Sequence, residues 1–136
     1  MFHILNFGSG VHPDARKNTA SLPTIRLESF SKVQIPMSMH IGVPCTPCVA
    51  AGDDVAVGQK IGDCEAFMSV PVHASVSGKV TAVRKVVSSS GGPVEVVEIE
   101  SDGLNRIHAS VIPPQINSRE DFIKAIRASG LVGLGG

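Results

Sequence analysis

Two cysteines three residues apart are the first candidates for chemistry in this chain. Cys45 and Cys48 lie in the motif Pro-Cys-Thr-Pro-Cys at residues 44–48. In redox proteins, a Cys-x-x-Cys pair cycles between dithiol and disulfide, with one thiol activated and the other resolving. Because the N-terminal cysteine of such motifs is usually the more exposed, we expect Cys45 to be the attacking thiol.

Two other interpretations of the cysteine pair remain open. Free cysteine is often buried, so both residues could be small core side chains of a strand or turn. Zinc would need two more ligands, for which His40 and Cys64 are candidates by residue type. A second Cys-x-x-Cys would have indicated zinc strongly. Since the sequence has none, we assign no metal site.

Among the histidines, His40 has the best claim to take part in thiol chemistry. A cation or hydrogen-bond donor five residues before Cys45 could lower the pKa of its thiol. The alternative for His40, and our expectation for His12 and His73, is that the histidine holds a turn by hydrogen bonding. The sequence has no Ser-His-Asp spacing, no paired-carboxylate motif and no complete phosphate loop, so we expect no self-contained catalytic site.

Composition and charge exclude several classes of protein. The 136 residues carry 12 Lys and Arg against 12 Asp and Glu, a balance that argues against nucleic acid as the main partner. Three cysteines are too few for a disulfide-dense secreted scaffold. No apolar run approaches the roughly 18 residues of a membrane span, and the start does not resemble a signal peptide. We therefore expect a soluble intracellular protein of one-domain size.

The elements expected around the thiols are short strands. Frequent valines interrupted by Gly and Pro favour strands and tight turns over helices. Alternating apolar and polar residues predict a strand between Thr24 and Ile35, ended by Pro36. Further strands are expected at 48–50, 55–57, 60–61, 67–76, 80–83 and 94–99. This spacing predicts a mainly β protein, a small sandwich or barrel.

One helix is expected near the end of the chain. Ser118 followed three residues later by Asp121 is a capping-box-like start, and Gly130 is placed to end the helix in a left-handed cap. Phe122, Ile123 and Ile126 would form its apolar face. The apolar, glycine-rich end at 130–136 is typical of an internal segment of a longer chain.

A turn pattern in the middle of the chain resembles biotinyl and lipoyl carrier domains. Its residues are Gly52-Asp53, Gly58-Gln59, Glu65-Ala66 and Ser77-Gly78, with valines between them. The resemblance implies a barrel–sandwich hybrid. Carriers present a lysine just after Glu-Ala, whereas this chain has Phe67-Met68-Ser69 there, so a carrier function is not expected.

A closer resemblance covers nearly the whole chain. The segments at 8–13, 35–44 and 69–80 look like the N-terminal domain of the RnfC family, and Gly133, Gly135 and Gly136 look like the opening of its flavin and NADH loop. RnfC is a subunit of an ion-pumping ferredoxin:NAD oxidoreductase. The resemblance implies FMN, NADH and iron–sulfur clusters in a full-length protein, and no cofactor in these residues alone.

The Cys-x-x-Cys motif departs from RnfC itself and is similar to the proline reductase-associated electron-transfer branch. That branch implies a relay in which Cys45 and Cys48 pass electrons from a flavin and iron–sulfur part to a partner reductase. The alternative is a non-catalytic docking domain of an RnfC subunit. Its partners would be the protein's own downstream domains and the membrane Rnf subunits, at the cytoplasmic face of the cell membrane.

Together these observations predict three parts. Residues 1–23 would form an extended N-terminal arm, 24–113 the barrel–sandwich hybrid, and 114–136 the helix and the start of a glycine-rich loop. That loop would lead to a flavin/NADH domain that these residues do not include.

Overall fold

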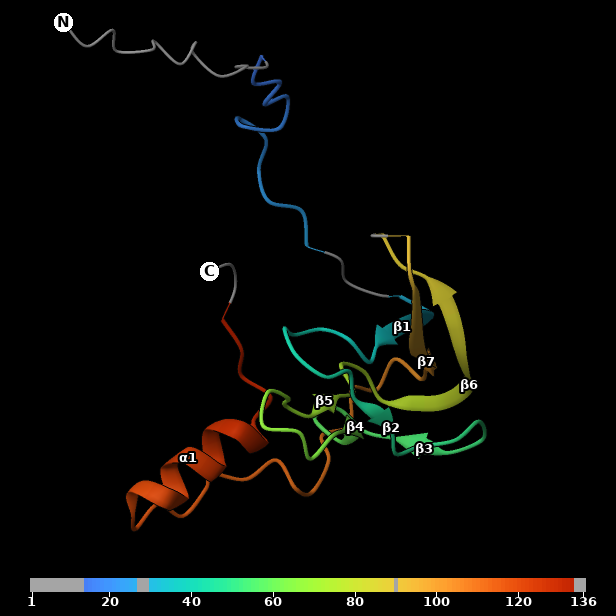
Figure 1. The fold of residues 1–136 in the computed structure, drawn as a ribbon. Helices are drawn as coiled ribbons and strands as arrows, with labels where there is room; N and C mark the ends of the chain where they lie inside the picture. Colours follow the sequence, from blue (N-terminus) through green and yellow to red (C-terminus); the bar gives the residue numbers. More distant parts are fainter. Residues whose placement is uncertain (1–13, 27–29, 90, 134–136) are drawn as a thin grey trace, which may run out of the picture.

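The computed structural model describes residues 14–26, 30–89 and 91–133, and its strands form two small antiparallel sheets (Figure 1). The first sheet has the order β1-β7-β6-β3, and the second has the order β2-β4-β5. The strands are β1 (Lys32–Pro36), β2 (Thr46–Pro47), β3 (Asp54–Val55), β4 (Lys60–Asp63), β5 (Val72–His73), β6 (Gly78–Val87) and β7 (Pro93–Ser101). The mainly β architecture expected from the turn spacing is confirmed.

The core lies between the two sheets and consists of small and medium apolar side chains. It is formed by Ile35, Met37, Cys45, Val55, Ile61, Val72, Ala74, Val76, Val80, Val97 and Ile99. At the start of β6, buried and exposed residues alternate, as they do in half-buried strands, whereas β7 is buried continuously from Val96 to Ile99. Short strands with many valines can fill such a narrow interior without any large aromatic side chain.

Three expectations about the strands are wrong. No strand forms at 48–50, because β2 lies just before it, at Thr46–Pro47. The strand expected from Thr24 begins only at Lys32, and Ile25 is 87% exposed. Of the apolar segment 67–76, only Val72–His73 pairs as a strand. Alternation alone does not reveal whether a partner strand is available. In the described part of the chain, residues 24–26 and 67–71 pair with no strand. Residues 14–26 are exposed and contain neither strand nor helix.

The helix, α1 (Arg119–Ala128), begins and ends where the sequence predicts. The Ser118 hydroxyl accepts a hydrogen bond from the Asp121 backbone N–H at 3.0 Å, and Gly130 has the expected positive φ of 73°. No residue of α1 is buried, and its apolar side chains Phe122, Ile123 and Ile126 are exposed. No helix in the described residues is long and apolar enough to cross a membrane.

A buried carboxylate on β7 should make stability depend on pH. Glu98 is 2% exposed and pairs with Lys32 and Arg84, while Gln34 Nε2 donates to its Oε1 at 3.1 Å. Hydrogen bonds from Lys32 and then Arg84 hold the pKa of Glu98 below its usual value, although burial opposes them.

Because the pKa of Glu98 is depressed in the folded protein, its stabilising contribution is present above the usual glutamate pKa. The contribution is lost as pH falls through the depressed value. We expect the unfolding midpoint of the wild type to drop between about pH 5 and about pH 3, and the drop to be smaller in Glu98→Gln. Thermal unfolding followed by circular dichroism measures this, with Glu100→Gln, an exposed carboxylate on the same strand, as control. Parallel curves for wild type and Glu98→Gln would contradict it.

Candidate functional site

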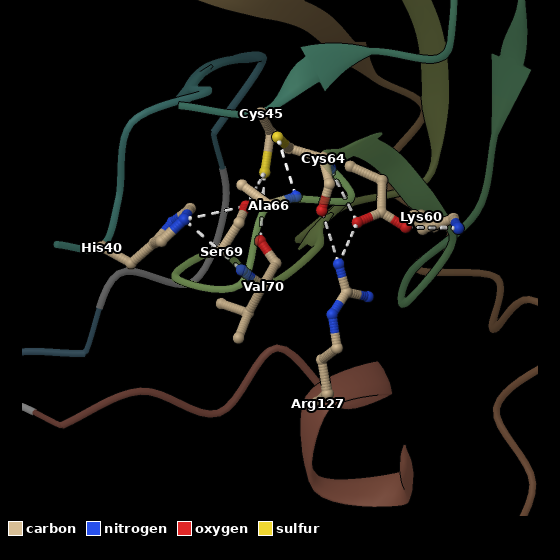
Figure 2. A network of polar contacts seen from close by, with 9 residues as sticks. His40, Cys45, Lys60, Cys64, Ala66, Ser69, Val70 and Arg127 are labelled. Atoms are coloured by element: carbon tan, nitrogen blue, oxygen red, sulfur yellow. Dashed lines mark hydrogen bonds and ion pairs between the residues drawn. The ribbon is translucent and has the colours of Figure 1, made fainter. Parts of the chain in front are cut away.

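Cys45 lies inside the protein, just before β2. It is 4% exposed and belongs to the apolar core. Its thiol donates to the Val70 carbonyl at 3.0 Å and lies 3.8 Å from the Ser69 hydroxyl (Figure 2). The Cys45 backbone N–H donates to the Met37 carbonyl at 2.8 Å. The thiol is therefore held in a defined position by the connection between β4 and β5.

Cys48 lies at the other end of β2 and is exposed. Its Sγ is 3.5 Å from the Lys60 carbonyl oxygen. Partial burial raises the pKa of the Cys48 thiol, and the nearby positive charge of Lys60 offsets only part of that rise. Since the thiolate is the nucleophile, a raised pKa makes Cys48 less reactive near neutral pH.

The expectation that Cys45 is the more exposed thiol is wrong. Cys45 is buried and Cys48 is exposed, because their side chains leave opposite faces of the extended segment that contains β2. Three residues of extended chain span about 10 Å, whereas a disulfide needs Cα atoms within about 7 Å. Cys45 and Cys48 can form a disulfide only if this segment leaves its extended conformation.

His40 lies near Cys45 but reaches it through Ser69. Its Nε2 is 3.2 Å from the Ser69 hydroxyl and accepts the Val70 backbone N–H at 3.4 Å. An Nε2 that accepts a hydrogen bond carries no proton in the neutral ring, so it could take up a proton through the hydroxyl. His40 Nδ1 is buried and has no hydrogen-bond partner among the described residues.

Sequence reasoning missed Ser69, which bridges the histidine and the thiol. Ser69 is 5% exposed and lies 29 residues after His40 in the sequence. The only signal for it was its place in the segment 69–80 that resembles the RnfC family. His40 and Ser69 also line an open cleft together with the exposed side chains of Met39, Ile41 and Phe67.

A charged cluster connects α1 to β4 beside the thiols. Arg127 donates to the Asp63 carboxylate at 3.0 Å and to the Cys64 carbonyl at 2.6 Å, and Lys60 donates to Asp63 at 2.8 Å (Figure 2). Burial alone would raise the pKa of Asp63, but hydrogen bonds from Lys60, the Cys64 N–H and Arg127 outweigh it and lower that pKa. Asp63 raises the pKa of Lys60 in turn.

The other predicted site residues take separate positions. His73 lies on β5, where burial lowers its pKa. His12, Gly135 and Gly136 lie outside the described residues. Gly133 lines the same open cleft as His40 and Ser69, and its part in a flavin and NADH loop stays a prediction. The described residues contain no group of three His, Cys, Asp or Glu side chains that could hold a metal ion or cluster.

The fold and the site together define a barrel–sandwich hybrid without the carrier lysine. At the place of that lysine, Phe67 and Met68 are exposed and Ser69 turns inward to the thiol. Residues 5–104 match the family model described as the RnfC barrel sandwich hybrid domain. The chain belongs to the RnfC family, whose N-terminal domain it contains.

Its relatives are subunits of ion-translocating complexes. The chain is 48% identical over 136 residues to a subunit of the Na⁺-translocating ferredoxin:NAD⁺ oxidoreductase complex of Acetobacterium woodii. It is 38% identical over 138 residues to the counterpart in the proton-translocating complex of Clostridium ljungdahlii. It is 32% identical over 146 residues to the counterpart in the ion-translocating oxidoreductase complex of Rhodobacter capsulatus. The matches cover 96–100% of this chain but only 28–30% of the relatives.

Proposed function

We propose that this chain is the N-terminal module of an electron-transfer subunit in an ion-translocating ferredoxin:NAD⁺ oxidoreductase. The observation that carries the proposal is the family match over the barrel, together with 48% identity to a subunit of such a complex. In a full-length protein, FMN, NADH and iron–sulfur clusters would be held by other residues.

The proposed partners are the downstream parts of the same subunit and the membrane subunits of the complex. Exposed apolar side chains on α1 support such a contact, because apolar residues at regular helical spacing usually pack against another surface. This assembly would hold the module peripherally at the cytoplasmic face of the cell membrane. The division into an arm at 1–23, a barrel at 24–113 and a connecting segment at 114–136 remains part of this proposal.

A finer proposal gives the module a thiol relay. As the sequence predicts it, this chain resembles the proline reductase-associated electron-transfer branch, Cys45 and Cys48 alternate between dithiol and disulfide, and His40 activates a thiol. A partner reductase receives the electrons. The contacts from His40 to Ser69 and from Ser69 to Cys45 support a role for His40 beside the Cys45 thiol. We favour electron transfer over a purely structural docking domain, since the relatives are named as oxidoreductase subunits.

The relay predicts that Cys45 is needed for electron delivery and not for electron uptake. In the full-length protein, Cys45→Ser should leave reduction of the bound flavin by NADH unchanged and slow electron transfer to the partner about tenfold or more, because the thiol step is removed. Stopped-flow absorbance measures both rates.

Thr46→Ala, at the exposed neighbour of Cys45, is the matched control and should change neither rate. If Cys45→Ser transfers electrons as fast as the wild type, the thiols take no part and the module serves docking alone.

A further inference from the structure

We propose that the disulfide partner of Cys45 is Cys64 rather than Cys48. The strand register carries this inference. β2 and β4 are antiparallel, with Thr46 opposite Asp63 and Pro47 opposite Gly62. The next position along the same register places Cys45 opposite Cys64, and Figure 2 draws both side chains in one close view.

The backbone hydrogen bonds around β2 indicate whether the Cys45 and Cys64 positions correspond to a hydrogen-bonded or a non-hydrogen-bonded cross-strand pair. Cys48 N–H donates to the Ile61 carbonyl of β4, whereas Cys45 N–H donates in the other direction, to Met37. Bonded and non-bonded pairs alternate along an antiparallel ladder. If the register continues one residue past the ends of β2 and β4, Cys45 and Cys64 take the position of a non-hydrogen-bonded pair. In such pairs the Cα atoms are about 4.5 Å apart and the side chains are at their closest. That separation lies within the range of disulfides.

Local packing also brings β4 close to Cys45. Gly62 has no side chain, and a Cβ built on it would lie 3.3 Å from the Cys45 Cβ. The Sγ of Cys64 accepts the Ala66 backbone N–H at 3.5 Å. Both thiols therefore contact the short segment 64–70, Cys64 at Ala66 and Cys45 at Ser69 and Val70.

The reaction is a thiol–disulfide exchange with a small-molecule or protein disulfide as oxidant. Cys64, which is only partly buried, attacks one sulfur of the oxidant and releases its first thiol. Cys45 then attacks the Cys64 sulfur and releases the second thiol, which takes up the proton that Cys45 loses. Two thiols lose two electrons and two protons, and one disulfide becomes two thiols.

The test maps the disulfide directly in the purified chain equilibrated with oxidised and reduced glutathione. Trypsin cleavage after Lys32, Lys60 and Lys79 places Cys45 and Cys48 on peptide 33–60 and Cys64 on peptide 61–79. After free thiols are alkylated, mass spectrometry should find the two peptides linked in the wild type and in Cys48→Ser. The link should fall about tenfold or more in Cys45→Ser and in Cys64→Ser.

Three outcomes would overturn the inference: a disulfide within peptide 33–60, a link that persists in Cys45→Ser, or thiols that stay free in oxidised glutathione. Circular dichroism checks that each variant is folded. If Cys45→Ser does not fold, the loss of the link in Cys64→Ser tests the inference instead. The inference is independent of the proposed electron transfer, because disulfide mapping requires neither flavin nor partner. If the Cys45–Cys64 disulfide is mapped but Cys45→Ser transfers electrons as fast as the wild type, the relay is contradicted and the disulfide pairing stands.

Discussion

Gly78→Ala should lower the free energy of unfolding by at least about 3 kcal/mol, because both the backbone and the available space oppose a side chain there. Gly78 begins β6 with a φ of +150°, a conformation that L residues rarely adopt. A Cβ at this position would lie 1.9 Å from the Glu100 carbonyl oxygen. That oxygen is part of the backbone of β7, so it cannot move without disturbing the longest strand pair. Urea unfolding followed by circular dichroism measures the loss.

Gly91→Ala is the matched control for Gly78. Gly91 also has a positive φ, of 85°, but a Cβ built on it meets nothing within 4 Å. Its substitution should cost about 1 kcal/mol, from backbone strain alone. Equal losses for the two variants would mean that the contact with Glu100 contributes nothing.

Ile61→Ala should destabilise the protein by about 3 kcal/mol, since it empties a fully buried site in a core of small side chains. Ile61 is 0% exposed, and its carbonyl accepts the Cys48 N–H. The narrow space between two short sheets leaves few large neighbours that could collapse into the cavity. We expect a lower urea midpoint with an unchanged dependence on urea concentration.

Ile41→Ala removes the same atoms from a side chain that is 87% exposed. Its effect should stay within about 0.5 kcal/mol. A loss in Ile41→Ala as large as that in Ile61→Ala would show that burial in the core is not what Ile61 contributes.

The helix and the general architecture could be predicted because their determinants are local. Ser118, Asp121 and Gly130 lie within 13 residues of one another, and each acts through its own turn of backbone. Valine spacing and glycine turns likewise indicate short strands wherever those strands pair. The strand expected before Lys32 failed because β pairing depends on a partner far away in the sequence.

The candidate site could be predicted only in part, for the same reason. The sequence identifies Cys45, Cys48 and His40 by type and spacing. It cannot tell that Cys45 faces the core, since burial depends on which face of the sheet β2-β4-β5 packs against the core. The Ser69 bridge and the pairing of β2 with β4 next to Cys64 both arise from contacts between residues that are far apart in the sequence.

The hydrogen bond from Arg127 to the Cys64 carbonyl connects α1 directly to the residue that carries the Cys64 thiol. Cys64 supplies both the thiol and the carbonyl oxygen that accepts the hydrogen bond from Arg127. A displacement of the Cys64 backbone therefore changes this hydrogen bond directly. Asp63 holds the same guanidinium at 3.0 Å and limits how far it can swing. A partner that packs on the apolar face of α1 would thus be coupled, through Arg127, to the position of the Cys64 backbone just after β4.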